Sequence, residues 1–436
     1  MGKNPLFTKK RKTMKENPSN LAVARWIYLP NDILVDIFNR LGLCPTTSVT
    51  FSATTFDIKL GEYDLYDTPL LWNILDNIFT IFANLPLLKT FSLQLPNTSL
   101  YVIKPSSWNV IASWARRLRQ HNLQHFEVKS YRSCVPYGGY YRVNIPSAFR
   151  INSLVSLDLN LSMYEFLWCI PNSIDLPNLK KLSLILADYT NLGILIRSCP
   201  SLRDLNFTIH KVQKANKDSI QISSKRLKRL NVCLYGSSSI LELIIIDAPK
   251  LKHLNFSSDR LSCDELIFDS ITHVKSLTLL YSSPLLHNYP TRTKTTIFPN
   301  MTRLTLALGN FKKLEDLSSM LHCPNLEELV LEVTSFYGMD IPQKPKVNPF
   351  EHLKRLDLEI KAIRLDGELL ELAAYILRSA PVLEKLILYA RSSYIHSNNS
   401  LPEDEFYRSL YKYPRISSHC QIQLSGAYGS PTCSRD

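Results

Sequence analysis

The chain has 436 residues, 45% of them hydrophobic, and a formal net charge of +13. This length allows a large buried core. The most apolar run, Leu241–Ala248, contains Glu242 and Asp247. It is far shorter than the about 20 residues that a membrane-spanning helix needs, so a buried strand is expected there and a membrane partner is not.

The cysteines and the N-terminus indicate the compartment. The nine cysteines include no C-x-x-C pair, which argues against a metal ribbon and against thioredoxin-like chemistry. No apolar segment follows the lysines near the N-terminus, so secretion is not expected. The simplest interpretation is that the thiols stay reduced and that the protein is located in the nucleus, the cytoplasm or both.

Residues 1–20 are polar and rich in lysine, so a disordered basic tail is expected there. Its run Lys9-Lys10-Arg11-Lys12 is either a nuclear-import signal or a solvated arm. In the rest of the chain the positive charge is spread along the sequence, and no motif that reads DNA or RNA is present. Nucleic-acid binding by the folded part is therefore not expected.

The segment 31–41 predicts a short amphipathic helix. Asn31 or Asp32 can cap it and Gly42 can end it. Its apolar residues recur at the spacing of one helix face, namely Ile33, Leu34, Ile37, Phe38 and Leu41. A helix this short needs a partner for that face, either the rest of this chain or another protein.

The next hundred residues predict a connector and two helices. Residues 44–68 are rich in Thr, Ser and Asp, which indicates a connector. Helices are expected over 70–85 and over 108–118, the second beneath a cap at Ser106 or Ser107. The aromatic residues of both helices are expected in the core rather than in a ligand site.

A short pattern, L-x-x-L-x-L with aromatic or β-branched replacements, recurs about every 23–30 residues. It indicates a solenoid of leucine-rich repeats, an α/β fold that offers a long surface to a partner. The copies begin at Leu88, Leu123, Leu154, Leu179, Leu202, Leu227, Leu251, Val274, Met301, Leu326, Leu353 and Leu383.

Each repeat is expected to contain one strand and a return segment. Prolines two residues before many of the leading apolar residues mark the start of the strand, at Pro177, Pro200, Pro249, Pro299, Pro324 and Pro381. Helical return segments are expected before Pro200, Pro324 and Pro381. Because every return crosses the outside, consecutive strands must run parallel.

Side chains alternate along a strand, so the apolar positions point inward and the positions between them line the concave face. This face is either a solvated strand surface or a recognition surface for a protein, and the second is favoured. The predicted substrate-binding residues are Asp158, Asn160, Lys181, Asp204, Asn206, Arg229, Asn231, His253, Asn255, Arg303, Glu328, Arg355 and Asp357, and the same exposed row includes Glu332 and Lys385.

Three segments together resemble the plant F-box/LRR-repeat proteins with a C-terminal FBD region. Residues 29–41 are similar to the opening L-P-x-[DE]-x-[IL]-x-x-I-[LF]-x-x-L of an F-box. The repeats carry C-P-x-L joints at Cys199 and Cys323. Residues 369–386 and the stretch Tyr413–Ile422 are similar to the FBD region. The resemblance covers about residues 26–425.

The resemblance implies a non-catalytic substrate-recognition subunit of an SCF-type (Skp–cullin–F-box) ubiquitin ligase. The partners would be a Skp-type adaptor, a cullin bound through that adaptor, and a protein substrate on the repeats. The adaptor contacts implied by the motif are Leu29, Pro30, Ile33, Leu34, Ile37, Phe38 and Leu41.

The chain departs from the F-box pattern after residue 43. A full F-box continues with more helix and an S-x-x-W-like stretch, whereas this chain passes into Cys44–Phe56 without such a tryptophan. The expected organisation is a basic tail (1–20), a truncated F-box-like helical segment (26–56), irregular first repeats (57–150), leucine-rich repeats (151–340), FBD-like C-terminal repeats (341–425) and a tail (426–436). The alternative is a repeat scaffold that is no longer coupled to a ligase.

No motif for catalysis is present, neither a Walker loop nor G-x-G-x-x-G, H-E-x-x-H or G-x-S-x-G. His121 and His125 straddle the end of a predicted helix, so a metal site there is not expected. Cys199 and Cys323 occupy equivalent repeat positions, which packing explains better than catalysis. We therefore expect no cofactor, no metal and no enzymatic activity on this chain.

Overall fold

The chain divides into two compact units, residues 1–132 and residues 133–436. The structure, a computed structural model, describes residues 48–52, 54–60, 69–82, 88–95, 105–130, 141–143, 145–161, 166–186, 191–210, 218–235, 241–245, 247–258, 271–280, 298–307, 323–333, 350–360, 367–390 and 403–426.

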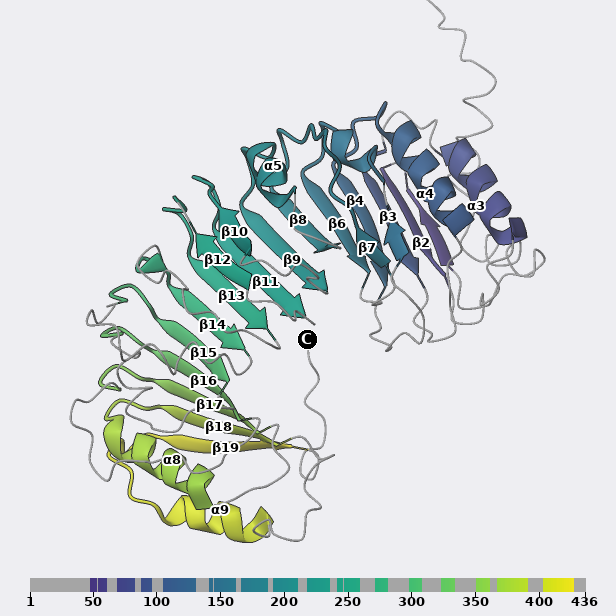
Figure 1. Ribbon diagram of the computed structural model, residues 1–436. Coiled ribbons are helices and arrows are strands. Elements are labelled where there is room, and N and C mark those ends of the chain that lie inside the picture. The colour runs from purple at the N-terminus through teal and green to yellow at the C-terminus, as the bar shows by residue number, and fades with distance from the viewer. Residues whose placement is uncertain are drawn as a thin grey trace, which may run out of the picture. The chain divides into compact units, whose positions relative to one another are not determined.

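Among the described residues, the first unit contains four strands and two helices (Figure 1). Strand β1 (Ser48–Phe51) pairs antiparallel with β2 (Thr55–Lys59). Strands β3 (Thr90–Leu95) and β4 (His125–Ser130) follow in parallel. Helix α3 (Pro69–Phe82) lies between β2 and β3 in the chain, and α4 (Pro105–Leu118) lies between β3 and β4.

Aromatic residues form the core of the first unit. Phe79 of α3 stacks on Trp114 of α4 with 4.9 Å between ring centroids, and both contact Phe91 of β3. The indole Nε1 of Trp114 donates a hydrogen bond of 2.8 Å to Asp76 Oδ1, which satisfies its only polar group. The expectation that these aromatic residues belong to the core is confirmed.

The second unit is dominated by a series of parallel strands, and each strand of the series pairs with the one that follows it in the series (Figure 1). They are β6 (Ser156–Leu161), β8 (Lys181–Leu186), β9 (Asp204–His210), β11 (Arg229–Tyr235), β13 (His253–Ser258), β14 (Ser276–Leu280), β15 (Arg303–Ala307), β16 (Glu328–Val333), β17 (Arg355–Ile360), β18 (Lys385–Ala390) and β19 (Gln421–Gly426).

In the described part of each of the twelve copies of the leucine pattern, a strand begins two residues after the leading apolar residue. The apolar residues of the pattern are buried, for example Leu202, Leu205 and Phe207 around β9. The parallel pairing, the one-strand repeat and the buried leucines confirm the predicted solenoid.

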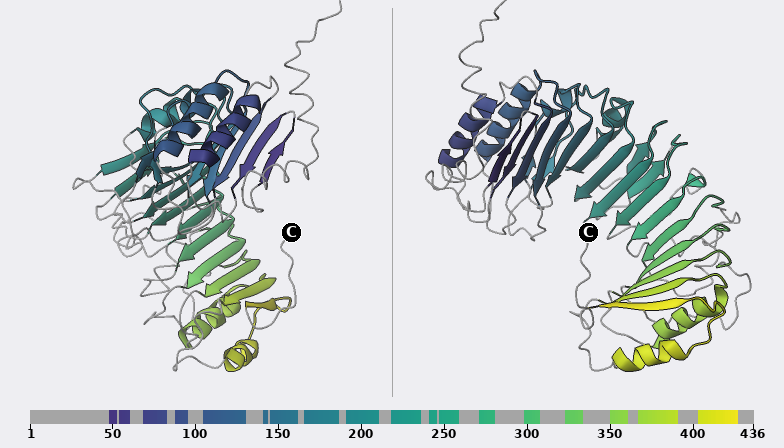
Figure 2. Two further views of the ribbon diagram at one scale, coloured as in Figure 1. Left: turned by 90° about the vertical axis from the view of Figure 1, so that its right-hand side faces the viewer. Right: turned by 180° about the vertical axis from the view of Figure 1, so that it is seen from behind.

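Smaller elements complete the second unit (Figure 2). Strands β5 (Tyr141–Val143) and β7 (Phe166–Trp168) pair with each other. Strands β10 (Asp218–Ile222) and β12 (Leu241–Ile245) form a separate parallel pair. The helical segments are η1 (Ala148–Arg150), α5 (Leu192–Arg197), α8 (Gly367–Ser379) and α9 (Glu403–Lys412), of which α8 and α9 lie side by side.

The prolines before the strands occupy tight turns. In the sequence Cys199-Pro200-Ser201-Leu202, the amide of Leu202 donates a hydrogen bond of 3.0 Å to the carbonyl of Cys199. Pro200 is therefore the second residue of a four-residue turn, where its fixed φ is favourable. The same bond closes the turns that end at Leu179, Leu251, Met301, Leu326 and Leu383.

Two local predictions in the first unit are wrong. The segment 44–68 was expected to be a connector, but β1 and β2 form a hairpin within it, because Phe56 and Ile58 alternate with polar residues and fill the core. Helix α4 begins at Pro105, so Ser106 and Ser107 lie inside its first turn rather than at its cap. Proline suits that first helical position.

Several other predictions can be placed. The run Leu241–Ala248 contains strand β12, as expected. The expected return helices before Pro200 and Pro381 are α5 and α8. The return helix expected before Pro324, the basic tail (1–20) and the helix over 31–41 lie outside the described residues. None of the described helices is long and apolar enough to cross a membrane.

Candidate functional site

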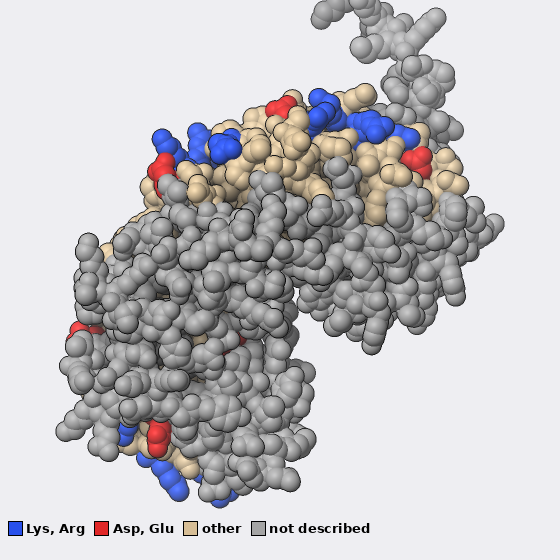
Figure 3. Space-filling model, viewed as in Figure 1, with Lys and Arg blue, Asp and Glu red and all other residues tan. Residues whose placement is uncertain are grey.

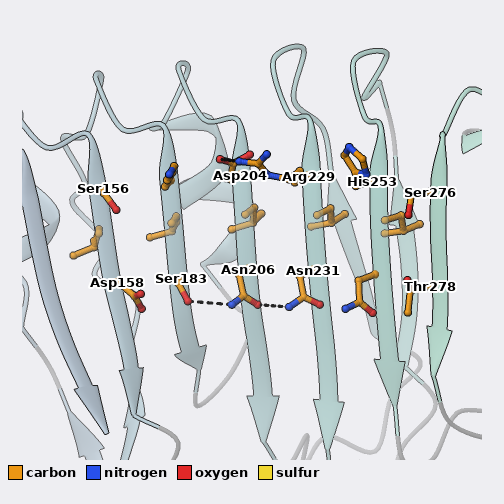
Figure 4. A pocket seen from close by; sticks show the side chains of 17 residues that line it. Ser156, Asp158, Ser183, Asp204, Asn206, Arg229, Asn231, His253, Ser276 and Thr278 are labelled. Atoms are coloured by element: carbon orange, nitrogen blue, oxygen red, sulfur yellow. Dashed lines mark hydrogen bonds and ion pairs between the residues drawn. The ribbon is translucent and has the colours of Figure 1, made fainter. Parts of the chain in front are cut away.

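A shallow groove of about 530 Å³ crosses the strands of the second unit from β6 to β14 (Figure 4). Its floor is formed by the side chains that alternate with the buried leucines. We call this surface of the strands the polar face. Because each strand contributes the same two positions, the groove is lined by two rows of side chains that run across the strands.

The strand register sets the composition of the two rows. Cα partners across β6 to β14 place Ser156, Lys181, Asp204, Arg229, His253 and Ser276 in the first row. The second row, by the same register, holds Asp158, Ser183, Asn206, Asn231, Asn255 and Thr278. The first row is mixed in charge, and the second consists almost entirely of hydroxyl and amide groups.

Hydrogen bonds connect the second row across three strands (Figure 4). Asn206 Nδ2 donates to Ser183 Oγ at 3.1 Å, and Asn231 Nδ2 donates to Asn206 Oδ1 at 2.8 Å. Each amide thus keeps further donor and acceptor capacity for a ligand. The ladder fixes the orientation of the amides, so a partner meets a preorganised surface.

The next amide in the row has an open acceptor. The Oδ1 atom of Asn255 is buried and has no hydrogen-bond partner among the described residues. A buried acceptor without a partner costs free energy that a donor from a bound molecule can recover. Asn255 is therefore a position in the groove that favours a hydrogen-bond donor from outside.

The charges of the first row largely cancel. Arg229 forms an ion pair of 2.6 Å with Asp204 on the neighbouring strand. Partial burial lowers the pKa of the largely exposed His253, and the positive charges of Arg229 and Lys252 lower it further, although Asp204 acts in the opposite direction. His253 is therefore neutral at pH 7, and the groove carries little net charge.

The structure brings together eight of the predicted substrate-binding residues as groove lining, namely Asp158, Lys181, Asp204, Asn206, Arg229, Asn231, His253 and Asn255. Asn160 lies on β6, two residues after Asp158, and does not line the groove. The remaining residues, Arg303, Glu328, Arg355 and Asp357, lie on β15, β16 and β17 outside the groove.

The expectation that the whole row is exposed is wrong on β16 and β17. Asp357 is only 7% exposed and Glu332 only 8%. Asp357 accepts two hydrogen bonds of 2.9 Å from Arg355, two residues earlier on the same strand. Its Cα partners across the strands, Val330 and Ile387, are apolar and also buried. This part of the polar face is therefore packed rather than solvated.

Four groove residues were missed from the sequence, namely Ser156, Ser183, Ser276 and Thr278. They occupy the same repeat positions as the predicted residues, so the repeat register was the signal that could have identified them. They were overlooked because small hydroxyl residues stand out less than charged residues and amides.

The groove has the chemistry of a binding surface. Among the described residues no group of three or more metal-ligating side chains occurs. Cys199 and Cys323 do not line the groove. Burial raises the pKa of both thiols to about 12. Both are thus protonated at pH 7 and packed in the core, and Cys323 contacts the sulfur of Met301 at 3.6 Å.

The second unit is a leucine-rich-repeat solenoid, a class of fold that binds through the exposed side of its strands. The family model described as "FBD-associated F-box protein At5g56370, LRR repeats" matches residues 111–265. This match covers the strands from β4 to β13 and therefore most of the groove.

Relatives from Arabidopsis thaliana extend the similarity. The chain is 27% identical over 334 residues to putative F-box/FBD/LRR-repeat protein At5g22610, an alignment that covers 64% of this chain and 65% of that protein. It is 26% identical over 369 residues to FBD-associated F-box protein At5g22730, covering 72% and 74%. For putative FBD-associated F-box protein At5g22720 the identity is 28% over 332 residues, covering 63% and 68%.

These matches confirm the predicted resemblance to plant F-box/FBD/LRR-repeat proteins. The chain spans slightly less than two thirds of the first of these relatives. The relatives' names denote F-box and leucine-rich-repeat proteins rather than enzymes. The seven residues implied as adaptor contacts, Leu29, Pro30, Ile33, Leu34, Ile37, Phe38 and Leu41, lie outside the described residues.

Proposed function

We propose that this protein is the substrate-recognition subunit of an SCF-type ubiquitin ligase and binds a protein on the polar face between β6 and β14. The observation that carries the proposal is the groove of about 530 Å³, whose amides and hydroxyls are held in two rows by the repeat register. The names of its relatives support an F-box-type adaptor role.

The groove suits a protein partner. Amide side chains offer a donor and an acceptor at once, as do the main-chain groups of a polypeptide. The internal Arg229–Asp204 ion pair leaves little net charge to attract a highly charged ligand. A neutral surface of preorganised hydrogen-bonding groups selects its partner by geometry more than by charge.

In the proposed mechanism this chain performs no chemistry. The apolar residues of the segment 29–41 bind a Skp-type adaptor, which is held by a cullin. The polar face holds the substrate, and ubiquitin transfer becomes faster because the substrate is kept near the transferring enzyme. Nuclear or cytoplasmic localisation is part of the same proposal.

The test is co-expression of the chain with a Skp-type adaptor, followed by purification of the complex. The double variant Leu34→Asp with Ile37→Asp places two charges on the apolar side of the segment and is expected to abolish the complex. A matched control, Val35→Asp with Asn39→Asp, introduces the same two side chains and the same change of charge on the side of the predicted helix away from the apolar residues, and should retain the complex. Circular dichroism verifies that all three proteins are folded. Absence of a complex with the unaltered chain would rule out ligase coupling.

A second candidate is a repeat scaffold that binds its partner without a ligase. One observation favours it. Strand β1 (Ser48–Phe51) forms a hairpin with β2 within the segment where a full F-box would continue as helix. This candidate predicts that a bound protein is not ubiquitinated in a reconstituted reaction. Ubiquitination that depends on residues 29–41 would exclude it.

A further inference from the structure

Five neighbouring strands of the main sheet, namely β8, β9, β11, β13 and β14, are each preceded by an exposed cation. The cation is the first x of the leucine pattern, so it recurs once in every repeat from β8 to β14. The five residues are Lys180, Arg203, Lys228, Lys252 and Lys275. Read along the sequence, they are 23 to 25 positions apart, which is why the positive charge looks diluted there.

Main-chain hydrogen bonds place these residues on adjacent rungs. The amide of Arg203 donates to the carbonyl of Lys180 at 2.9 Å, and the amide of Lys228 donates to the carbonyl of Arg203 at 2.7 Å. The series continues through Lys252 at 2.8 Å and Lys275 at 2.9 Å. With about 4.8 Å between parallel strands, the five rungs span about 19 Å. We call this row the basic edge.

A second observation marks the same edge. A cavity of about 550 Å³ lies between the end of α5 and the turn before β11. Its lining combines three cations with three hydroxyl groups and includes no carboxylate, the polar residues being Arg197, Ser201, Ser223, Ser224, Lys225 and Arg226. Such a set of donors suits an anionic group.

Carboxylates are few at this edge. In the described turns from residue 171 to residue 275, Asp175 and Asp247 are outnumbered by lysines and arginines. Figure 3 shows Lys and Arg side chains gathered near α5. Among the described residues, none of the five cations of the basic edge forms an ion pair, so their charge is available to a partner.

The same row continues into the C-terminal repeats with a different composition. The equivalent positions there are Thr302, Glu327, Lys354 and Glu384. The only cation among these four, Lys354, forms an ion pair of 3.2 Å with Glu327 on the preceding rung. The basic edge is therefore a property of the repeats from β8 to β14 and not of the solenoid as a whole.

We infer that the basic edge binds an acidic segment of a polypeptide, with one of its anionic side chains in the cavity beside α5. An extended segment of about six residues covers the 19 Å of the edge, at about 3.3 Å per residue. Two or three carboxylates in such a segment face the row. This site is separate from the groove on the polar face, and its partner need not be the protein held there.

A protein partner fits this edge better than a nucleic acid. Sites for single-stranded nucleic acid combine cations with aromatic side chains on which bases stack. The described turns that carry the basic edge contain Pro, Ser, Asn and aliphatic residues, and His273 is their sole ring that offers a stacking surface. Charge complementarity without a stacking platform favours an acidic peptide.

The experiment measures binding of the full-length protein to a fluorescein-labelled peptide with six consecutive glutamates, by fluorescence anisotropy at 50 mM NaCl. The test variant is Lys228→Glu with Lys252→Glu. The matched control is Lys354→Glu with Lys412→Glu, which changes the net charge equally at exposed positions of the C-terminal repeats. Both variants retain the N-terminal basic tail, so any contribution of the tail to binding is the same in each.

The test variant is expected to bind the peptide at least about tenfold more weakly than the unaltered protein, and the control within about twofold, because the basic edge is altered in only one of them. Equal losses in both variants would overturn the proposal in favour of non-specific attraction. A single-stranded oligonucleotide of six phosphates is measured in parallel. Tighter binding of the oligonucleotide, lost in the test variant, would assign the edge to nucleic acid instead. Circular dichroism confirms that both variants fold.

Discussion

The middle repeats (β8 to β14) and the C-terminal repeats (β16 to β18) share one core but present different surfaces. In both, the leucines of the repeat pattern are buried and the strands are parallel and in register. On the polar face, the middle repeats carry Asn231 and Asn255 where the C-terminal repeats carry Val330 and Ile387. The repeat pattern thus fixes the architecture, while the positions between the leucines decide whether a surface is open for binding or packed.

Truncating a core leucine should have the largest effect on stability, and the effect should be equal in the two regions. Leu230→Ala in β11 and Leu356→Ala in β17 each remove a fully buried side chain, so each should lower the free energy of unfolding by about 2–5 kcal/mol. Urea denaturation followed by circular dichroism measures this. The exposed Lys228→Ala serves as control and should change stability by less than about 0.5 kcal/mol. A mild effect of Leu356→Ala alone would show that the core differs between the regions.

A second pair of substitutions separates the two surfaces. Ile387 is buried on the polar face of β18, so Ile387→Ala should destabilise the protein by about 2–4 kcal/mol. Asn255 holds the corresponding position on β13 with an acceptor that has no partner among the described residues, so Asn255→Ala should cost less than about 0.5 kcal/mol. Denaturation curves of the two variants decide this. If both cost the same, the surfaces are not distinct.

Arg229 of the first row and Arg355, which holds the equivalent position on β17, provide a subtler contrast. Arg355→Ala leaves the buried carboxylate of Asp357 without its two hydrogen bonds, and we expect a loss of about 1–3 kcal/mol. Arg229→Ala breaks a more exposed pair with Asp204, and a loss below about 1 kcal/mol is expected. Thermal unfolding of both variants against the unaltered chain measures the difference. A larger cost for Arg229→Ala would contradict the assignment of the C-terminal face as packed.

The smallest expected effect is on the pH dependence of stability. Because the pKa of His253 is lower in the folded protein than its ordinary value near 6.5, the unfolded chain binds a proton at higher pH than the folded one. The contribution of His253 to stability is therefore present above about pH 6.5 and is lost as the pH falls below it. His253→Gln should flatten the decline of stability between pH 7 and pH 5. An unchanged pH profile in this variant would show that His253 is not coupled to folding.

Much of the second unit could be predicted from the sequence because a leucine has one role in each repeat. A single pattern located the strands, their direction and their buried faces. The environment of the side chains between the leucines was harder to predict. The burial of Asp357 depends on the neighbours Val330 and Ile387 from two other strands, and sequence spacing alone does not weight such contacts. The cations of the basic edge are far apart in the sequence, and only the register brings them together.

The first unit shows a different limit. Its hairpin (β1 and β2) arises in a Thr- and Ser-rich stretch with two buried apolar residues, Phe56 and Ile58. So short an alternation is a weak signal in isolation. It becomes a strand because Phe56 packs between Phe79 and Phe91, residues that are brought near by the fold. Tertiary contacts therefore decided this element more than local propensity did.

The central claim is that the groove of the middle repeats holds a protein for ubiquitin transfer. Its most direct test compares the proteins captured from plant extract by the adaptor-bound chain and by two folded variants, using quantitative mass spectrometry. The groove variant is Asn206→Arg with Asn231→Arg, and the control is Gln421→Arg with Gln423→Arg on the polar face of β19. We expect a protein that the unaltered chain and the control both capture, that the groove variant loses, and that is ubiquitinated in a reconstituted reaction. If the groove variant captures the same proteins as the unaltered chain, the polar face is not the substrate site.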